Sequence, residues 1–283
     1  EIDAMSFLNE NDFSVNIPME YYYKKKWNRG WMNIVNPFRG TLLIGTPGSG
    51  KSFSVVNSYI RQHSAKGFAM MIYDFKFPDL ANIAFYNFLM NKKKGLIPEI
   101  FEFNVVNFND IEYSRRINPL RPEYLRTLAD AIETATAVVE SLKKGGNESG
   151  GGSDQFFSQS AINFLASCLF YFSKYGPKDE NGKRQYGAWS DLPHVLAFMN
   201  RSYAEIFEAL FKEKELESLL SPFRSAYDNK AFDQLEGQIG TLKISISRLA
   251  TKESYWVFSG DDFSLYITNP DAPSYLIIAN SPA

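Results

Sequence analysis

The clearest chemical pattern in the chain is the run Gly-Thr-Pro-Gly-Ser-Gly-Lys-Ser at residues 45–52, which fits G-x-x-x-x-G-K-S. Glycines let such a loop turn so that successive backbone N–H groups point inward, and the positive end of a following helix adds to the same potential. Donors arranged in this way bind the phosphate groups of a nucleotide. We predict that Lys51 contacts the β- and γ-phosphates and that Ser52 holds Mg²⁺.

The neighbours of this run are those that a phosphate-binding loop requires. Residues 41–45 (Thr-Leu-Leu-Ile-Gly) are typical of a short buried strand, and a helical pattern extends from Ser52 to about Ser64. A chance glycine-rich turn has neither neighbour. The residues expected to bind the nucleotide are Thr46, Pro47, Gly48, Ser49, Gly50, Lys51, Ser52 and Phe53. Lys51 is also expected to be catalytic, and Ser52 is the expected metal ligand.

ATP is the expected nucleotide. Guanine selectivity requires an Asn-Lys-x-Asp motif, and residues 229–232 read Asn-Lys-Ala-Phe, with phenylalanine where a carboxylate reads the base. The Asp-Glu-Asn-Gly run at residues 179–182 matches a second GTPase pattern, but it lies in a polar segment and does not follow a strand. A GTPase is therefore disfavoured.

A second carboxylate normally completes the magnesium shell and polarises the attacking water. Asp74 follows the apolar run 68–73 and is the candidate so placed, and we predict it as a catalytic residue. The alternative is that Asp74 caps a loop or pairs with Lys76. Asp261 and Asp262 also have two interpretations, a metal-binding pair or a turn between aromatic runs, and the turn is favoured.

Composition and cysteine content exclude several classes of protein. The chain has 283 residues, 45% hydrophobic and 22% charged, which indicates a globular protein of about two domains. Its single cysteine, Cys168, forms no internal disulfide, and with His63 and His194 it gives no zinc-ligand spacing. A reducing, cytosolic environment is expected, and Cys168 is interpreted as an inert core residue.

The apolar runs predict an α/β fold with a parallel sheet. Strands buried on both faces are expected at residues 41–45, 68–73, 101–106 and 275–279. From residue 118 to 254 helical periodicity replaces them, with helices expected at about 121–142, 153–174, 190–200, 202–219 and 223–250. We therefore predict a nucleotide-binding domain of residues 1–117 and 255–283, and an all-α insertion of residues 118–254. The glycine-rich segment 145–152 is expected to be mobile.

Charge is spread evenly, and the formal net charge is −2. Any contact with nucleic acid must therefore come from local clusters such as Lys24–Lys26 or Lys92–Lys94, for which the alternative is an ordinary solvated surface. Residues 155–173 carry no charged side chain, but seven of them are Gln, Ser or Asn. A helix buried in protein is favoured over a membrane span for this segment.

Several segments resemble the coupling proteins of type IV secretion and conjugative mobilisation, in the form found in Bacteroides-like bacteria. The segments that carry this resemblance, which covers nearly the whole chain, are residues 30–45, 74–76, 153–157, 255–263 and 272–282. The resemblance implies a RecA-like motor domain with an all-α insertion that hydrolyses ATP with Mg²⁺. It also implies a homo-hexamer at the cytoplasmic face of the bacterial inner membrane, which feeds single-stranded DNA bound to a relaxase or relaxosome into the type IV secretion channel.

The same resemblance implies that this chain is a fragment. Coupling proteins have N-terminal membrane spans and continue beyond residues 275–279 to a further strand that ends in the magnesium-shell and catalytic carboxylates. We therefore expect the chain to be inactive as an ATPase by itself. Two alternatives remain open: a nucleotide-gated adaptor that recruits a relaxase or effector protein through its helical domain, and a small-molecule kinase with the same type of loop.

Overall fold

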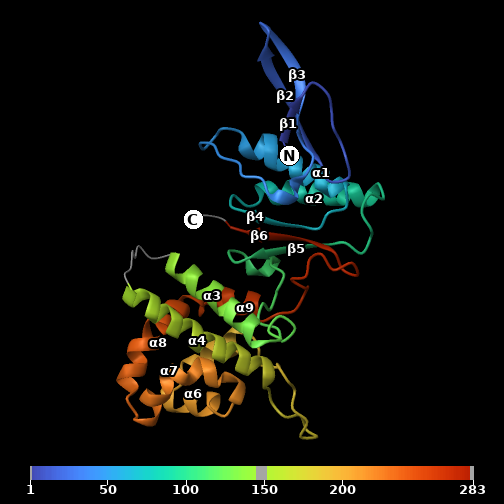
Figure 1. Cartoon of the computed structure of the whole chain (residues 1–283). Coiled ribbons are helices and arrows are strands. Elements are labelled where there is room, and N and C mark those ends of the chain that lie inside the picture. The colour runs from blue at the N-terminus through green and yellow to red at the C-terminus, as the bar shows by residue number, and fades with distance from the viewer. Residues whose placement is uncertain (1, 145–151, 281–283) are drawn as a thin grey trace. The chain divides into compact units, whose positions relative to one another are not determined.

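The computed structural model describes the backbone of residues 2–144 and 152–280, and the side chains of residues 6–142 and 159–280. The chain forms two compact units, one of residues Glu1–Arg115 with Ser264–Ala283 and the other of residues Arg116–Phe263 (Figure 1). Residues 145–151 of the glycine-rich segment lie outside the described residues.

The first unit begins with an antiparallel sheet. Its strands β1 (Ile2–Met5), β2 (Val15–Tyr23) and β3 (Lys26–Ile34) are arranged in the order β1-β3-β2. Strands β2 and β3 form a hairpin whose two-residue turn, Lys24–Lys25, has φ angles of 49° and 59°. Positive φ at both central residues is what a tight hairpin turn requires. The sequence analysis did not predict this hairpin.

The unit also contains a three-stranded parallel sheet. It consists of β4 (Met70–Asp74), β5 (Glu102–Asn107) and β6 (Ser274–Ala279), in the order β4-β6-β5. The structure is thus mixed α/β, and the predicted strands at 68–73, 101–106 and 275–279 are confirmed within two residues. The central strand β6 has a neighbouring strand on each side, and its side chains are mostly buried, with Tyr275 and Ile277 in contact with residues of the covering helices.

The prediction of a strand at residues 41–45 is wrong in this structure. After a short 3-10 helix η1 (Pro37–Arg39) the chain is irregular up to the phosphate loop, and Leu42 and Ile44 are 85% and 82% exposed. An apolar run becomes a strand only where a neighbouring strand pairs with its backbone, and none of the described strands pairs with this one. For the same reason β4 is an edge strand whose Met71 and Tyr73 are exposed, and it is not buried on both faces as predicted.

Two helices cover the parallel sheet. One helical turn of π type, η2 (Ser52–Val56), leads directly into α1 (Asn57–Ala65), and α2 (Asp79–Lys93) follows β4, while the 3-10 helix η3 (Ile111–Tyr113) follows β5. Apolar side chains of α1, α2, β4 and β6 form a shared core: Ile60, Ile72, Ala81, Ala84 and Ile277. The buried hydroxyl of Ser64 links three elements, because it accepts hydrogen bonds from Asn91 on α2 and from Tyr275 on β6.

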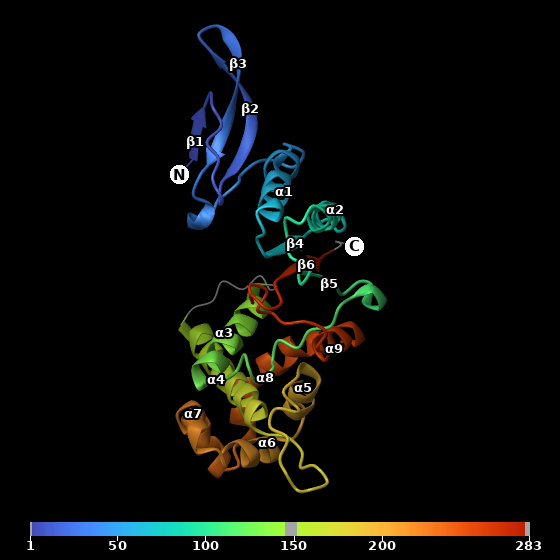
Figure 2. The ribbon, with the colours of Figure 1, turned by 90° about the vertical axis from the view of Figure 1, so that its right-hand side faces the viewer.

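The regular secondary structure of the second unit is helical in its described residues, apart from one isolated bridge between Lys178 and Arg184. Its elements are α3 (Leu128–Lys144), α4 (Gly152–Lys174), α5 (Leu192–Met199), α6 (Tyr203–Leu210), η4 (Lys214–Leu216), α7 (Glu217–Asp228), α8 (Phe232–Ile246), η5 (Ser247–Leu249) and α9 (Lys252–Phe258). Helix α4 packs against α3, α7 and α8 (Figure 2). Residues 160–173 of the uncharged segment therefore lie in a protein core, where Phe164 and Cys168 are fully buried. No described helix is long and apolar enough to cross a membrane.

Several predicted boundaries in this unit need correction. Residues 121–127 are not helical, and α3 begins at Leu128. The predicted helix 223–250 is divided by residues 229–231, because Lys230 has a φ of 53°, which no helix contains. The unit also extends to Phe263 rather than 254, since Tyr255 and Phe258 of α9 pack against its core.

We predict that Phe207→Ala destabilises the second unit by about 3–5 kcal/mol, because it empties a fully buried site among other aromatic rings. Ile244→Ala on α8 removes an exposed side chain and is the matched control. The free energies of unfolding can be compared by urea denaturation. Equal values for the two variants would show that Phe207 is not a core residue.

Candidate nucleotide-binding site

All eight residues predicted to bind the nucleotide lie together in one exposed loop and the helical turn that follows it. Within the loop the Ser49 amide donates to the Thr46 carbonyl at 3.2 Å, and the Ser54 amide donates to the Gly50 carbonyl at 2.9 Å. Gly48 and Gly50 have φ angles of 80° and 79°. Residues with a Cβ atom are strained at such angles, so the turns at both positions depend on glycine.

The side chain of Lys51 folds back over its own loop. Its Nζ donates to the carbonyl oxygens of Gly45 and Thr46, the latter at 2.8 Å, and lies 3.4 Å from Oγ of Ser49. A Cβ atom at residue 45 would lie 2.7 Å from Ser49 Oγ and 3.1 Å from Lys51 Cδ. The absence of a side chain at Gly45 therefore makes room for the lysine, and the ammonium group is surrounded by oxygen atoms.

The helix that follows presents an open N-terminus. Its first turn has no side-chain cap, and Ser52 and Phe53 are exposed. The first N–H groups of a helix have no partner within the helix and carry a partial positive charge. The Ser52 hydroxyl is thus accessible to a metal ion, and the helix terminus is open to an anion.

Asp74 has a clear structural role at the end of β4. The carboxylate is 1% exposed, and its Oδ2 accepts hydrogen bonds of 2.9 Å from the backbone amides of Leu80 and Ala81. These amides belong to the first turn of α2, so Asp74 caps that helix from the preceding strand. This geometry supports the capping alternative, and the catalytic role of Asp74 stays a prediction.

An apolar groove of about 300 Å³ runs along the open edge of β4. Four consecutive residues of the strand line it, Met70 to Tyr73, so the groove follows the edge of β4 rather than one face of the sheet. On the other side it is lined by Val56, Tyr59, Ile60 and His63 of the helix after the phosphate loop, and by Leu80. His63 stacks on Phe68 with 4.5 Å between ring centroids, and burial lowers the pKa of its imidazole.

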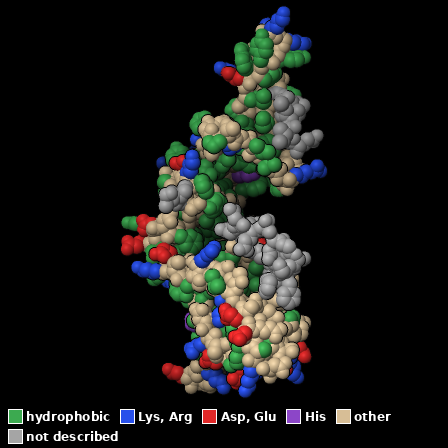
Figure 3. All heavy atoms as spheres, turned by 90° about the vertical axis from the view of Figure 1, so that its left-hand side faces the viewer, with side chains coloured by type: hydrophobic (Ala, Val, Ile, Leu, Met, Phe, Trp, Pro, Cys, Tyr) green, Lys and Arg blue, Asp and Glu red, His purple; other side chains and the backbone are tan. Residues whose placement is uncertain are grey.

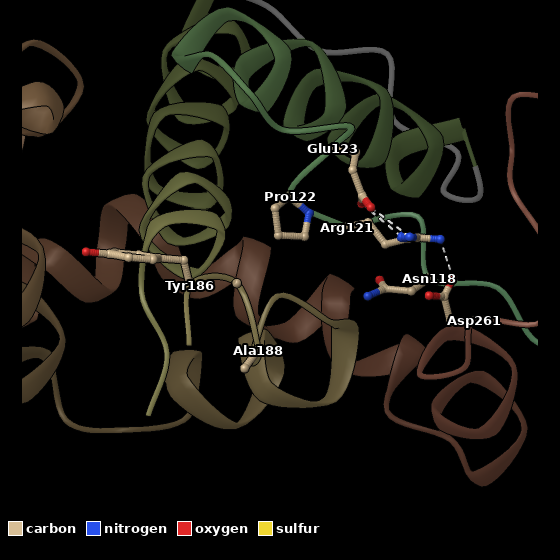
Figure 4. Close-up of a pocket in the computed structure, with 8 residues that line it drawn as sticks. Asn118, Arg121, Pro122, Glu123, Tyr186, Ala188 and Asp261 are labelled. Atoms are coloured by element: carbon tan, nitrogen blue, oxygen red, sulfur yellow. Dashed lines mark hydrogen bonds and ion pairs between the residues drawn. The ribbon is translucent and has the colours of Figure 1, made fainter. Parts of the chain in front are cut away.

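The second unit has a cavity of about 470 Å³ beside Arg121 (Figure 4). The Arg121 guanidinium pairs with Glu123 at 2.7 Å and with Asp261, and the hydrogen bond to Glu123 raises the pKa of Arg121 and lowers that of Glu123. Asn118 donates to the Ser190 carbonyl and accepts from the Leu120 amide. Arg121, Glu123 and Asp261 are thus engaged with each other, and Asn118 connects two further segments of the unit.

Asp261, Asp262 and Cys168 of the second unit have structural surroundings. Asp261 pairs with Arg121, and Asp262 accepts a hydrogen bond of 2.8 Å from the Arg116 amide, as expected for a turn. Among the described side chains, those of residues 6–142 and 159–280, no group of three His, Cys, Asp or Glu is placed to hold a metal ion. Complete burial raises the pKa of the Cys168 thiol, which makes it inert as a nucleophile.

Comparisons with models of known protein families and with curated proteins give no match.

We predict that Asp74→Ala lowers the free energy of unfolding by about 1–3 kcal/mol, because two buried amides of α2 lose their acceptor. Asp74→Asn is the matched control, since an amide oxygen still accepts a hydrogen bond there. Urea denaturation of both variants measures the difference. An Asp74→Ala variant as stable as the wild-type chain would contradict the capping role.

Proposed function

We propose that the first unit binds ATP with Mg²⁺ and is the motor part of a P-loop ATPase. The observation that carries this proposal is the loop at residues 45–52, in which glycine geometry, an oxygen-bound lysine and an open helix N-terminus occur together. Lys51 would contact the β- and γ-phosphates in place of its loop oxygens, and the Ser52 hydroxyl would hold Mg²⁺. The loop thus exchanges internal oxygen partners for those of the nucleotide.

The proposal includes completion of a RecA-like sheet by residues 41–45. Leu42 and Ile44 are exposed, while the groove beside β4 is apolar and open along a strand edge of the same unit. The segment has five residues and so does β4. Placed in the groove, the segment pairs with β4 as a parallel strand. Helix α1 is then the crossover connection between the two strands, which is the ordinary βαβ arrangement. Both apolar surfaces are then covered, and the phosphate loop lies at the carboxyl ends of the strands.

We expect slow hydrolysis because the Asp74 carboxylate is engaged in hydrogen bonds to the backbone. Its Oδ2 is occupied by two backbone amides, so this carboxylate does not serve as a free general base in the structure described. Positioned proton transfer typically contributes about 10²–10⁴-fold to a rate. We therefore expect the 283-residue chain to bind ATP but to turn it over slowly.

The wider role that we propose is that of a conjugative coupling protein. The resemblance noted in the sequence supports a homo-hexamer at the cytoplasmic face of the inner membrane that transfers relaxase-bound single-stranded DNA into a type IV secretion channel. The even charge distribution, with a net charge of −2, favours a second candidate: a nucleotide-gated adaptor that recruits relaxase or effector protein through its helical unit. DNA affinity that falls steeply with salt supports the first, and salt-insensitive protein binding the second.

We predict that Lys51→Ala weakens ATP binding about 10- to 100-fold, because hydrogen bonds to a charged group contribute about 1.5–3 kcal/mol. Arg61→Ala removes an exposed positive charge from α1 and is the matched control. Titration with a fluorescent ATP analogue gives the dissociation constants. Equal affinities for Lys51→Ala and the wild-type chain would contradict the assignment of the loop.

We also predict that a non-hydrolysable ATP analogue slows amide hydrogen exchange in residues 41–45 and along β4. Pairing of the two segments protects backbone amides that are otherwise open to water. Exchange in α6 of the second unit serves as the internal reference. Unchanged exchange at residues 41–45 with saturating nucleotide would contradict strand completion.

A further inference from the structure

The turn end of the β2–β3 hairpin concentrates aromatic and basic side chains. We define the hairpin tip as residues 20–29, which read Glu-Tyr-Tyr-Tyr-Lys-Lys-Lys-Trp-Asn-Arg. Tyr22, Tyr23 and Trp27 are 62%, 59% and 72% exposed. The tip has four basic side chains and one acidic, hence a net charge of +3 in a chain whose net charge is −2.

The tip is convex and lies apart from the helices of its own unit. Strand β1 pairs only with the base of β3, from Trp31 to Ile34, so the tip is a two-stranded ribbon. Figures 1 and 2 both show this end of the hairpin beyond α1 and α2, and Figure 3 shows hydrophobic and basic side chains next to each other there. Such a tip can reach a surface outside the protein.

Contacts within the tip hold the aromatic rings in place. Tyr22 and Trp27 are cross-strand neighbours whose rings pack edge to face, with centroids 5.5 Å apart. The Lys24 ammonium lies 5.4 Å from the centroid of the Tyr23 ring. Glu20 and Arg29 are the next cross-strand pair on the face that carries Tyr22 and Trp27. Nε of Arg29 lies 3.4 Å from Oε1 of Glu20. The aromatic side chains of the tip are therefore in contact with other tip residues while they remain exposed.

We propose that the hairpin tip binds the surface of an anionic lipid bilayer. Trp and Tyr rings have an apolar body and a polar edge, and they are enriched where hydrocarbon meets headgroups. Lysine side chains extend their ammonium groups toward lipid phosphates while their alkyl stems cover apolar surface. Each basic residue near an anionic surface strengthens binding, and three consecutive lysines beside three exposed rings combine both contributions.

Single-stranded nucleic acid fits this surface less well. Binding of a single strand combines a basic groove that follows the backbone with aromatic faces on which bases stack. The tip is convex, the Tyr22 and Trp27 rings pack against each other, and Lys24 lies over the face of Tyr23. A flat, negatively charged surface matches the convex tip better.

This inference does not depend on ATP binding, because no tip residue belongs to the phosphate loop. The test measures co-flotation of the whole chain with vesicles of phosphatidylglycerol and phosphatidylcholine, without nucleotide, compared with vesicles of phosphatidylcholine alone. The tip variants are Lys24→Gln/Lys25→Gln and Trp27→Ser. The matched control is Lys93→Gln/Lys94→Gln, which removes two exposed lysines from the end of α2.

We expect the chain to bind anionic vesicles only. Lys24→Gln/Lys25→Gln should lower the affinity for these vesicles on the order of tenfold or more, since each lysine contributes about 1 kcal/mol near such a surface. The control variant should bind with little change in affinity. We also expect Trp27→Ser to weaken binding and to abolish a blue shift of tryptophan emission on vesicle addition. Circular dichroism establishes that each variant is folded.

Three results would overturn the proposal: no binding to anionic vesicles, equal losses in the tip and control variants, or a Trp27→Ser variant that binds as the wild-type chain does. A parallel titration with oligothymidylate measures binding to single-stranded DNA, the alternative partner. If Lys24→Gln/Lys25→Gln weakens DNA binding and leaves vesicle binding unchanged, the tip is a nucleic-acid contact and the lipid proposal is wrong.

Discussion

The Lys51 ammonium group must be surrounded by oxygen atoms, and the geometry of the proposed site depends on this requirement. In the structure the oxygen atoms come from the loop itself, from the Gly45 and Thr46 carbonyls and the Ser49 hydroxyl. They reach the ammonium only because residue 45 has no side chain and because Gly48 and Gly50 adopt positive φ angles. Phosphate oxygens offer the same group stronger, charged partners. In the proposed ATP-bound form, these weaker internal partners of Lys51 are exchanged for phosphate oxygens.

A second constraint, the pairing of strand edges, connects the loop to the rest of the first unit. Backbone groups of a strand need partners, and the outer edge of β4 has none among the described strands. The residues just before the loop are apolar and exposed, while the groove beside β4 is apolar and open. The proposed nucleotide contacts and the proposed sheet completion thus fall on one continuous segment of the chain. If both proposals hold, nucleotide binding and the order of the sheet are physically linked.

The sequence predicted the parts of the fold that depend on local pattern. The run 275–279 is apolar throughout and became the central strand β6, and the helix predicted at residues 153–174 corresponds to α4. The strand expected at residues 41–45 failed because strand formation depends on a partner edge, which no local pattern contains. The tip hairpin was missed although Lys24-Lys25 lies between two runs rich in tyrosine and tryptophan. For Asp74 the sequence left two roles open, because only the tertiary structure places its carboxylate on the amides of Leu80 and Ala81.

The central claim is that the loop recognises the β- and γ-phosphates through Lys51 and the helix N-terminus. Isothermal titration calorimetry of the whole chain with ATP and with AMP, each with Mg²⁺, tests this claim most directly. The account predicts that one ATP binds per chain and that AMP binds more weakly by about two orders of magnitude or more. AMP has neither of these phosphates, and each charged hydrogen bond that it lacks contributes about 1.5–3 kcal/mol. Equal affinities for ATP and AMP, or no binding of ATP, would contradict it.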